Sequence, residues 1–388
     1  MTSQATRVEA TVTVPRAQAV SVRRVLAIDA LRGVALIMMA LDHASFFVGA
    51  GLQAESYGGQ RVALQGAAYW VSGLLTNLAS PIFFLLGGYS LALYAVAQRR
   101  KGRPESVTTR YMLIRAAIIL VLDLTVCAMA WRGATPYVHV LTTMAASLAI
   151  LSLLRLLPTT IVAGVGFATL LAHQTLIGSL AGALVAGEPQ PFWQAFWLTY
   201  SYNTQPALGF AVLGWGPLMW IGYALGTLQG RPALQQPRTW AVASLGLLGL
   251  WLSLRLLGNF GDLGPFGTVG YSPAHFLVMS KAPPSLTYLA FNLGLAALLL
   301  VGFYARPGLI ERGPLRGLVL VGQVSLFFYV AHLIVYNLVA QVFGLLNLPG
   351  PRVIWGYLAW ALGLTILLTL SAHYRQLRKR YPSILSYL

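Results

Sequence analysis

Four polar residues at the two ends of one apolar stretch are the first candidates for chemistry in this sequence. Asp29 and Arg32 stand at one end of the stretch, and Asp42 and His43 stand at the other. A helix rises about 1.5 Å per residue, so the segment from Asp29 to His43 would span roughly 21 Å. This length covers most of the hydrocarbon core of a bilayer, where ionisable groups are costly and mark functional sites.

His43 is the first candidate catalytic residue because an imidazole accepts a proton near neutral pH. Asp42 is the second, because a carboxylate close to the ring raises its basicity. Neighbours on a helix point about 100° apart, so the two side chains need not touch. A histidine that caps the outer end of a span explains His43 equally well, and the sequence leaves both interpretations open.

Asp29 and Arg32 lie three residues apart and therefore share one helix face. They form either a structural salt bridge or the polar floor of a pocket, in which Arg32 is available for a phosphate group. Arg115 and Asp123 lie two turns apart in a later apolar stretch, so each needs a partner on another helix or a water molecule.

A later polar segment contains Arg255, Asn259, Asp262, Lys281 and Ser285. A plain loop would explain its glycines and prolines, but it would not require Asp262 and Lys281 close to a span that carries His43.

His332 lies in the middle of another apolar stretch, where a polar side chain needs a partner. A helix–helix hydrogen bond and a role in a site are both compatible with this position.

The composition is that of an integral membrane protein. The chain has 388 residues, of which 57% are hydrophobic and 9% are charged, and its mean hydropathy is +0.70. The net charge of +17 does not indicate nucleic acid binding, because the basic residues form short clusters between apolar runs. The sequence contains no phosphate loop, dinucleotide-binding turn or metal-ligand spacing, so we predict no metal.

We predict an all-α, polytopic membrane helix bundle with about ten transmembrane helices. Most Lys and Arg residues then fall on the side of the two termini, which predicts that both termini are cytoplasmic. We expect a mobile tail at 1–24, one membrane domain at 25–374 and a basic tail at 375–388. The predicted spans are 26–48, 71–97, 110–131, 136–157, 159–183, 207–228, 239–258, 285–304, 318–345 and 353–374.

Several motifs in order resemble one family. They are IDALRG at 28–33 with LDH at 41–43, SPIFFLLGG at 80–88, GNFGD at 258–262, KAPPS at 281–285 and GQVSLFFYVAH at 322–332. With these motifs, the chain resembles the bacterial membrane proteins grouped with the heparan-alpha-glucosaminide N-acetyltransferase catalytic domain, within the transmembrane acyltransferase superfamily.

The resemblance implies acyl transfer from a cytosolic acyl-CoA, such as acetyl-CoA, to an amino-sugar, glycan or glycolipid outside the cytosol. His43 would be the base or the acyl carrier, with Asp42 beside it. Asp29, Arg32 and Arg115 would bind the acyl-CoA. Asn259, Asp262, Lys281, Ser285 and His332 would bind the acceptor. The resemblance also implies a bacterial cytoplasmic membrane.

Two other functions fit the residues. Buried charges and spans broken by Gly and Pro are typical of a transporter or flippase for a small polar solute. A non-catalytic envelope scaffold is the third hypothesis. The sequence leaves the acceptor and the acyl chain open, and a homo-oligomer is compatible with it.

Overall fold

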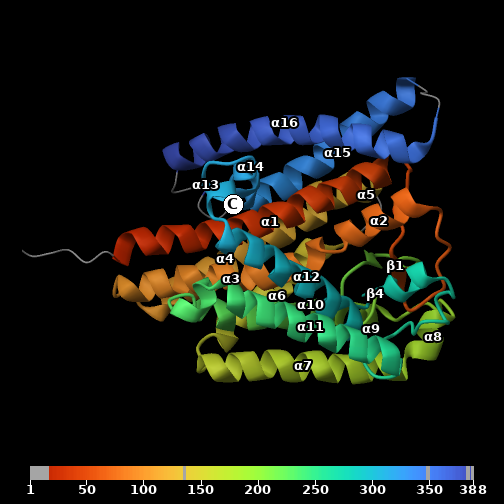
Figure 1. The fold of residues 1–388 in the computed structure, drawn as a ribbon, viewed down its shortest axis with the longest axis horizontal. Coiled ribbons are helices and arrows are strands. Elements are labelled where there is room, and N and C mark those ends of the chain that lie inside the picture. The colour runs from red at the N-terminus through yellow and green to blue at the C-terminus, as the bar shows by residue number, and fades with distance from the viewer. Residues whose placement is uncertain (1–16, 134–136, 347–349, 382–384, 386–388) are drawn as a thin grey trace, which may run out of the picture.

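The computed structural model describes residues 17–133, 137–346, 350–381 and 385. The helices run lengthwise through the molecule, with α16 and α7 on opposite sides of the bundle (Figure 1). The bundle helices are α1 (Ala17–Phe47), α2 (Ala67–Thr76), α3 (Ala79–Arg100), α4 (Glu105–Leu122), α5 (Ala128–Arg132), α6 (Val140–Leu154), α7 (Thr159–Ser179), α10 (Val212–Thr227), α11 (Pro237–Leu257), α12 (Leu286–Ala305), α14 (Arg316–Gln323), α15 (Ser325–Leu346) and α16 (Arg352–Arg380).

Shorter elements connect the long helices. The π-helix η1 (Asp123–Cys127) joins α4 to α5. The other short helices are α8 (Ala181–Val185), α9 (Phe192–Trp197), α13 (Gly308–Glu311), η2 (Pro232–Gln235) and η3 (Pro273–Leu277), and the strands are β1 (Glu55–Tyr57), β2 (Tyr137–Val138), β3 (Ala207–Leu208) and β4 (Met279–Ala282). Strand β1 pairs in parallel with β4, and β2 pairs in parallel with β3.

The prediction of an all-α membrane bundle is confirmed. Seven helices in the described part of the chain are long and apolar enough to cross a membrane. The other three predicted spans coincide with α1, which carries Asp29, Arg32 and Asp42, and with the shorter helices α6 and α10. The chain is therefore a multi-pass membrane protein, and large apolar side chains such as Leu245 and Val121 are exposed on its outer surface, as lipid contact requires.

The predicted tails differ from the structure at both ends. Helix α1 begins at Ala17, so residues 17–24 are helical, whereas residues 1–16 lie outside the described part. Helix α16 continues to Arg380, so the first residues of the predicted basic tail extend that helix. The beginning of α1 and the end of α16 lie at the same end of the bundle (Figure 1). The cytoplasmic orientation of this end stays a prediction.

Two glycines bring α1 and α14 into backbone contact. A Cβ atom added at Gly33 would lie 2.0 Å from the carbonyl oxygen of Leu318, and one added at Gly322 would lie 1.9 Å from the carbonyl oxygen of Asp29. Real Cβ atoms do not approach so closely, so only glycine permits this packing. This explains why glycine ends the IDALRG motif and begins the GQVSLFFYVAH motif, and it places Arg32 beside the α14–α15 junction.

The carboxylate of Asp123 lies at the start of α6. Its Oδ2 atom accepts hydrogen bonds from the backbone N–H groups of His139 and Thr142, at 3.0 and 2.8 Å, and from the Thr142 hydroxyl at 2.7 Å. A carboxylate stabilises a helix N-terminus because it pairs the free N–H groups there. Asp123 is therefore a structural group that fixes α6, in agreement with the expectation that it finds partners on another helix.

Candidate functional site

A cavity of about 940 Å³ lies between the helices. Arg32 and His43, which stand eleven residues apart on α1, both line it, so the cavity extends roughly 16 Å along this helix. It therefore connects the two polar clusters that the sequence places at opposite ends of the first span. We call the part near Arg32 the inner end and the part near His43 the outer end.

Arg32 is held at the inner end by three elements. Its guanidinium donates to Asp29 at 3.1 Å, to the Gly322 carbonyl oxygen at 3.0 Å and to the Ser90 hydroxyl at 2.5 Å. Asp29 also accepts a hydrogen bond from Gln323 at 3.4 Å. Arg32 lines the cavity and Asp29 does not, so Asp29 orients Arg32 from behind.

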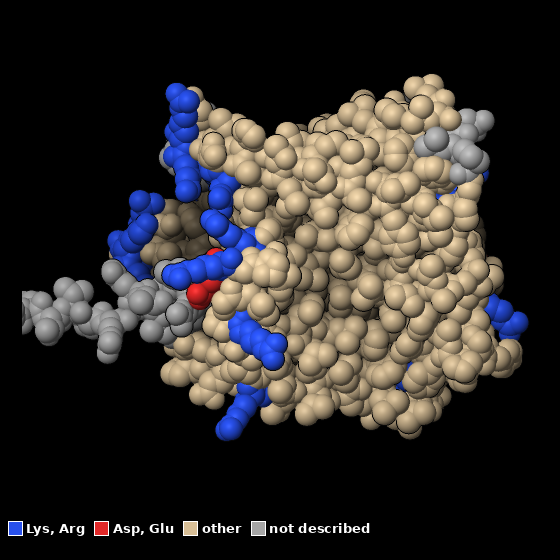
Figure 2. All heavy atoms as spheres, turned by 45° about the horizontal axis from the view of Figure 1, so that its top comes forward, with Lys and Arg blue, Asp and Glu red and all other residues tan. Residues whose placement is uncertain are grey.

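The inner end is strongly basic. Arg115 of α4 and Arg378 of α16 line the cavity together with Arg32, and Arg378 also donates to the Gln323 carbonyl oxygen at 3.0 Å. Figure 2 shows Lys and Arg side chains gathered around a hollow at the end of the molecule where α1 begins. The exposed basic residues at helix ends here include Arg99, Arg100, Lys379 and Arg380. An anionic ligand would be attracted to this end.

His43 lies at the outer end and contacts α15. Its Nδ1 atom is 2.6 Å from Nε2 of His332, and the Trp131 ring packs edge-on against it at 4.6 Å. His43 lines the cavity, whereas His332 is fully buried behind it and does not. His332 is therefore placed to contact the candidate base rather than a ligand in the cavity.

Lys281 reaches the outer end from β4. The register between β1 and β4 shifts by one residue between Ser56 and Tyr57, and Lys281 is the β4 residue that this shift leaves without an opposite residue. Such irregularities redirect a side chain. The Lys281 ammonium lies 3.0 Å from Glu55 and 3.9 Å from Asp42.

Lys281 stays protonated at the outer end. Burial lowers the pKa of Lys281, but the negative charges of Glu55 and Asp42 outweigh the burial, and the pKa of Lys281 lies well above its ordinary value. The outer end therefore keeps a fixed ammonium group within reach of both carboxylates.

Two acceptor atoms at the outer end lack partners among the described residues. Oε2 of Glu55 and Oε1 of Gln53 are buried, and neither receives a hydrogen bond. Both side chains line the cavity. Because an unpaired buried acceptor is costly, these oxygens favour a ligand or water that brings O–H or N–H donors.

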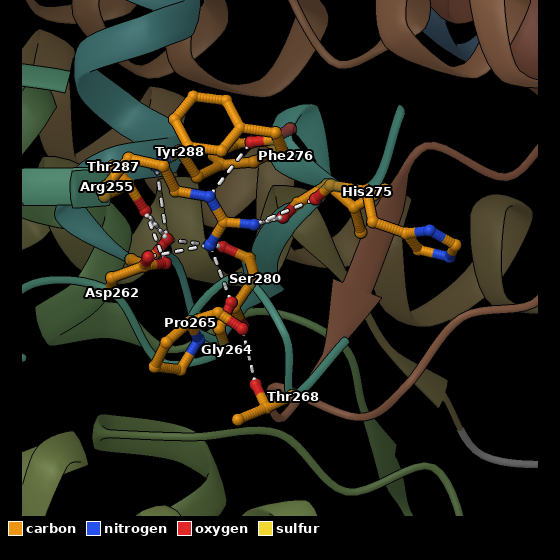
Figure 3. A network of polar contacts seen from close by, with 12 residues as sticks. Arg255, Asp262, Gly264, Pro265, Thr268, His275, Phe276, Ser280, Thr287 and Tyr288 are labelled. Carbon is orange, nitrogen blue, oxygen red and sulfur yellow. Dashed lines mark hydrogen bonds and ion pairs between the residues drawn. The ribbon is translucent and has the colours of Figure 1, made fainter. Parts of the chain in front are cut away.

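The other predicted loop residues lie away from the cavity. Asp262 accepts from Arg255 at 2.7 Å, and the Arg255 guanidinium also donates to carbonyl oxygens of four loop residues (Figure 3). Ser285 caps α12 by accepting from the N–H of Tyr288 at 3.2 Å. Asn259 is exposed just after α11. Of the five residues predicted to bind the acceptor, the structure brings Lys281 to the cavity and His332 against His43.

The cavity residues that sequence reasoning missed include Gln53, Glu55, Trp131, His139 and Arg378. Glu55 carried a usable signal, because it is one of only nine acidic residues and stands between two spans. His139 follows Tyr137 in a short connection, and nothing in its spacing distinguishes it. In the described part of the chain, no group of three or more His, Cys, Asp or Glu residues could hold a metal ion.

Fold and site together define a polytopic membrane protein with a cavity inside its helix bundle that carries polar and charged residues at both ends. Residues 25–372 match the model of the family described as Acyltransferase domain, so the chain belongs to this family and is a membrane acyltransferase by family. No curated protein matches the chain. The family favours the acyltransferase hypothesis over the transporter and scaffold hypotheses.

Proposed function

We propose that the protein transfers an acyl group, most simply acetyl, from cytosolic acyl-CoA to an amine or hydroxyl group outside the cytosol. The observation that carries the proposal is that one and the same cavity is lined by Arg32 at one end and by His43 at the other. Such a cavity offers a path from a basic binding region to a candidate base within one helix bundle.

The acyl-CoA would bind with its phosphates at the inner end. Arg32, Arg115 and Arg378 supply guanidinium groups, whose planar donors suit phosphate oxygens. Asp29 would act on this site through Arg32, by holding its guanidinium in place. The pantetheine arm would extend along the cavity and carry the thioester to the outer end.

His43 would act as the general base. The acceptor oxygen or nitrogen attacks the thioester carbonyl carbon while its proton passes to the imidazole of His43. The carbon–sulfur bond then breaks, and the CoA thiolate takes the proton from the imidazolium. In a two-step variant, His43 itself attacks the thioester and carries the acyl group to the acceptor.

The acceptor would bind beside Lys281 at the outer end. The unpaired oxygens of Glu55 and Gln53 favour an acceptor with several O–H or N–H donors, and an amino-sugar, glycan or glycolipid has this chemistry. Asp42 would act through Lys281, because its carboxylate lies 3.9 Å from the ammonium group and makes no hydrogen bond with His43 among the described residues.

We also propose that, within the transmembrane acyltransferase superfamily, the protein is related to the heparan-alpha-glucosaminide N-acetyltransferase group. The same proposal places the protein in a bacterial cytoplasmic membrane with the basic inner end facing the cytoplasm. The clustering of basic residues at that end supports this orientation, since cytoplasmic segments are enriched in Lys and Arg.

The test is release of free CoA by the purified protein in nanodiscs, with acetyl-CoA and a pool of amino-sugars and glycolipids. Wild type is compared with His43→Ala and with His373→Ala, which removes an exposed histidine of α16 outside the cavity. We expect acceptor-dependent release that His43→Ala abolishes and His373→Ala retains. Release that survives His43→Ala, or wild-type protein that neither binds acetyl-CoA nor releases CoA, would overturn the proposal.

A further inference from the structure

The two histidines at the outer end are joined through defined ring nitrogens. Nδ1 of His43 lies 2.6 Å from Nε2 of His332, and Nδ1 of His332 lies 3.2 Å from the carbonyl oxygen of Phe328. His332 is fully buried in α15. Three of the four ring nitrogens therefore take part in a defined contact, so the protons on the two rings are not independent.

The carbonyl oxygen fixes the order of the protons. It can only accept a hydrogen bond, so Nδ1 of His332 must carry a proton to donate to Phe328. A neutral imidazole has one proton, which leaves Nε2 of His332 as an acceptor. The hydrogen bond between the rings therefore needs its proton on Nδ1 of His43.

The remaining nitrogen of His43 is then unprotonated. Among the described residues, Nε2 of His43 has no hydrogen-bond partner, and His43 lines the cavity. We propose that His332 is a positioning residue that locks His43 in the tautomer with the proton on Nδ1, so that Nε2 is the proton acceptor presented to the cavity. This inference rests on the proposed function for its catalytic meaning, but the tautomer itself does not.

The same hydrogen bond to His332 also stabilises the charged form of His43. When Nε2 takes a proton, the imidazolium still donates from Nδ1 to His332, and this hydrogen bond becomes charge-assisted. The base of an acid–base pair is commonly oriented by a third group in this way. Here the third group is a neutral imidazole. The other ionisable side chains that line this end of the cavity include Asp42, Glu55, Tyr57, His139, Tyr202 and Lys281.

The first test is nitrogen-15 NMR of the protein with labelled histidine in nanodiscs, since the ring nitrogen shifts distinguish the two tautomers. The His43 signals are identified by their loss in His43→Gln. We expect wild-type His43 to carry its proton on Nδ1, and His332→Phe to shift His43 toward a mixture of tautomers. Wild-type His43 with its proton on Nε2, or a tautomer unchanged in His332→Phe, would overturn the proposal.

The second test is kinetic and compares His332→Phe with His332→Gln. Phenylalanine fills the space without an acceptor, whereas the glutamine carbonyl can still accept from His43. We expect His332→Phe to lower kcat about 100-fold with little change in KM, and His332→Gln to restore part of the loss. A wrong tautomer of a catalytic histidine costs a comparable or larger factor elsewhere.

The control is His173→Phe, which replaces a buried histidine that contacts the Leu198 carbonyl oxygen outside the cavity. Equal losses of kcat in His173→Phe and His332→Phe, or no rescue by glutamine, would indicate a packing role for His332 and overturn the inference. If wild type neither bound acetyl-CoA nor released CoA while His43 showed the expected tautomer, the proposed function would fail and the tautomer assignment would stand.

Discussion

Arg255 and Lys281 are both cations held against carboxylates near the same loop, but their surroundings differ. Arg255 is fully buried, and its guanidinium donates to Asp262 and to carbonyl oxygens of the loop (Figure 3). Lys281 lines the cavity, keeps some exposure and lies beside a carboxylate oxygen that has no partner among the described residues.

The difference separates a structural group from a candidate binding group. Every donor direction of the Arg255 guanidinium is used to join the end of α11 to the segment before β4, so it leaves nothing for a ligand. In the cluster of Lys281, Glu55 and Asp42, one carboxylate oxygen of Glu55 has no partner among the described residues, and a ligand or water could supply it. The sequence presents both pairs as charged residues in one loop, and only their hydrogen bonds distinguish them.

The largest expected effect is on stability, from Arg255→Met. This change leaves Asp262 as a buried charge without its partner and leaves several carbonyl oxygens unpaired. Removing one partner of a buried pair typically costs about 3–5 kcal/mol. We expect a large drop of the thermal unfolding midpoint in nanodiscs and low yield. A midpoint equal to that of wild type would show that Arg255 does not hold the loop.

Lys281→Gln should affect activity more than stability, in contrast to Arg255→Met. The glutamine amide still donates to Glu55, and the cavity lets water reach the carboxylates, so we expect a midpoint shift less than half that of Arg255→Met. The loss of a charged hydrogen bond at the outer end is worth about 1.5–3 kcal/mol. We therefore expect CoA release to fall roughly 10- to 100-fold. Loss of stability without loss of activity would erase the distinction between the two clusters.

The sequence was sufficient for the elements and for part of the site. Long apolar stretches separated by basic loops predicted the helices, because a membrane span must be apolar and satisfy its own backbone. Arg32 and His43 were found because charges inside an apolar stretch stand out. Glu55 and Arg378 reach the cavity only through the β1–β4 pairing and the close packing of α16, which are contacts between distant segments and leave no local pattern.

The same reasoning explains why Asp262 and Ser285 were predicted as binding residues. The resemblance supplied these roles through the GNFGD and KAPPS motifs, and both residues do lie beside the segment that carries Lys281 or the helix that follows it. Their side chains turn to Arg255 and to the start of α12, which a sequence without coordinates does not reveal.

Ser285→Ala tests whether Ser285, like Arg255, has a structural role, and it is a smaller change than Arg255→Met. The hydroxyl of Ser285 accepts from the N–H of Tyr288, and loss of such a helix cap typically costs about 1 kcal/mol. We expect a modest decrease of the unfolding midpoint with CoA release within about twofold of wild type at a temperature where both proteins are folded. A much larger loss of activity than of stability would place Ser285 in the binding site.

Asn259→Ala should have the smallest effect of all. Asn259 is exposed beyond the end of α11, does not line the cavity and belongs to neither charged cluster. Surface substitutions of this kind usually change stability by less than about 0.5 kcal/mol. We expect the unfolding midpoint and both kcat and KM to match wild type. An increase of KM for the acceptor at unchanged stability would show that the loop contacts the acceptor outside the cavity, and the binding region would then extend from Lys281 across the loop to α11.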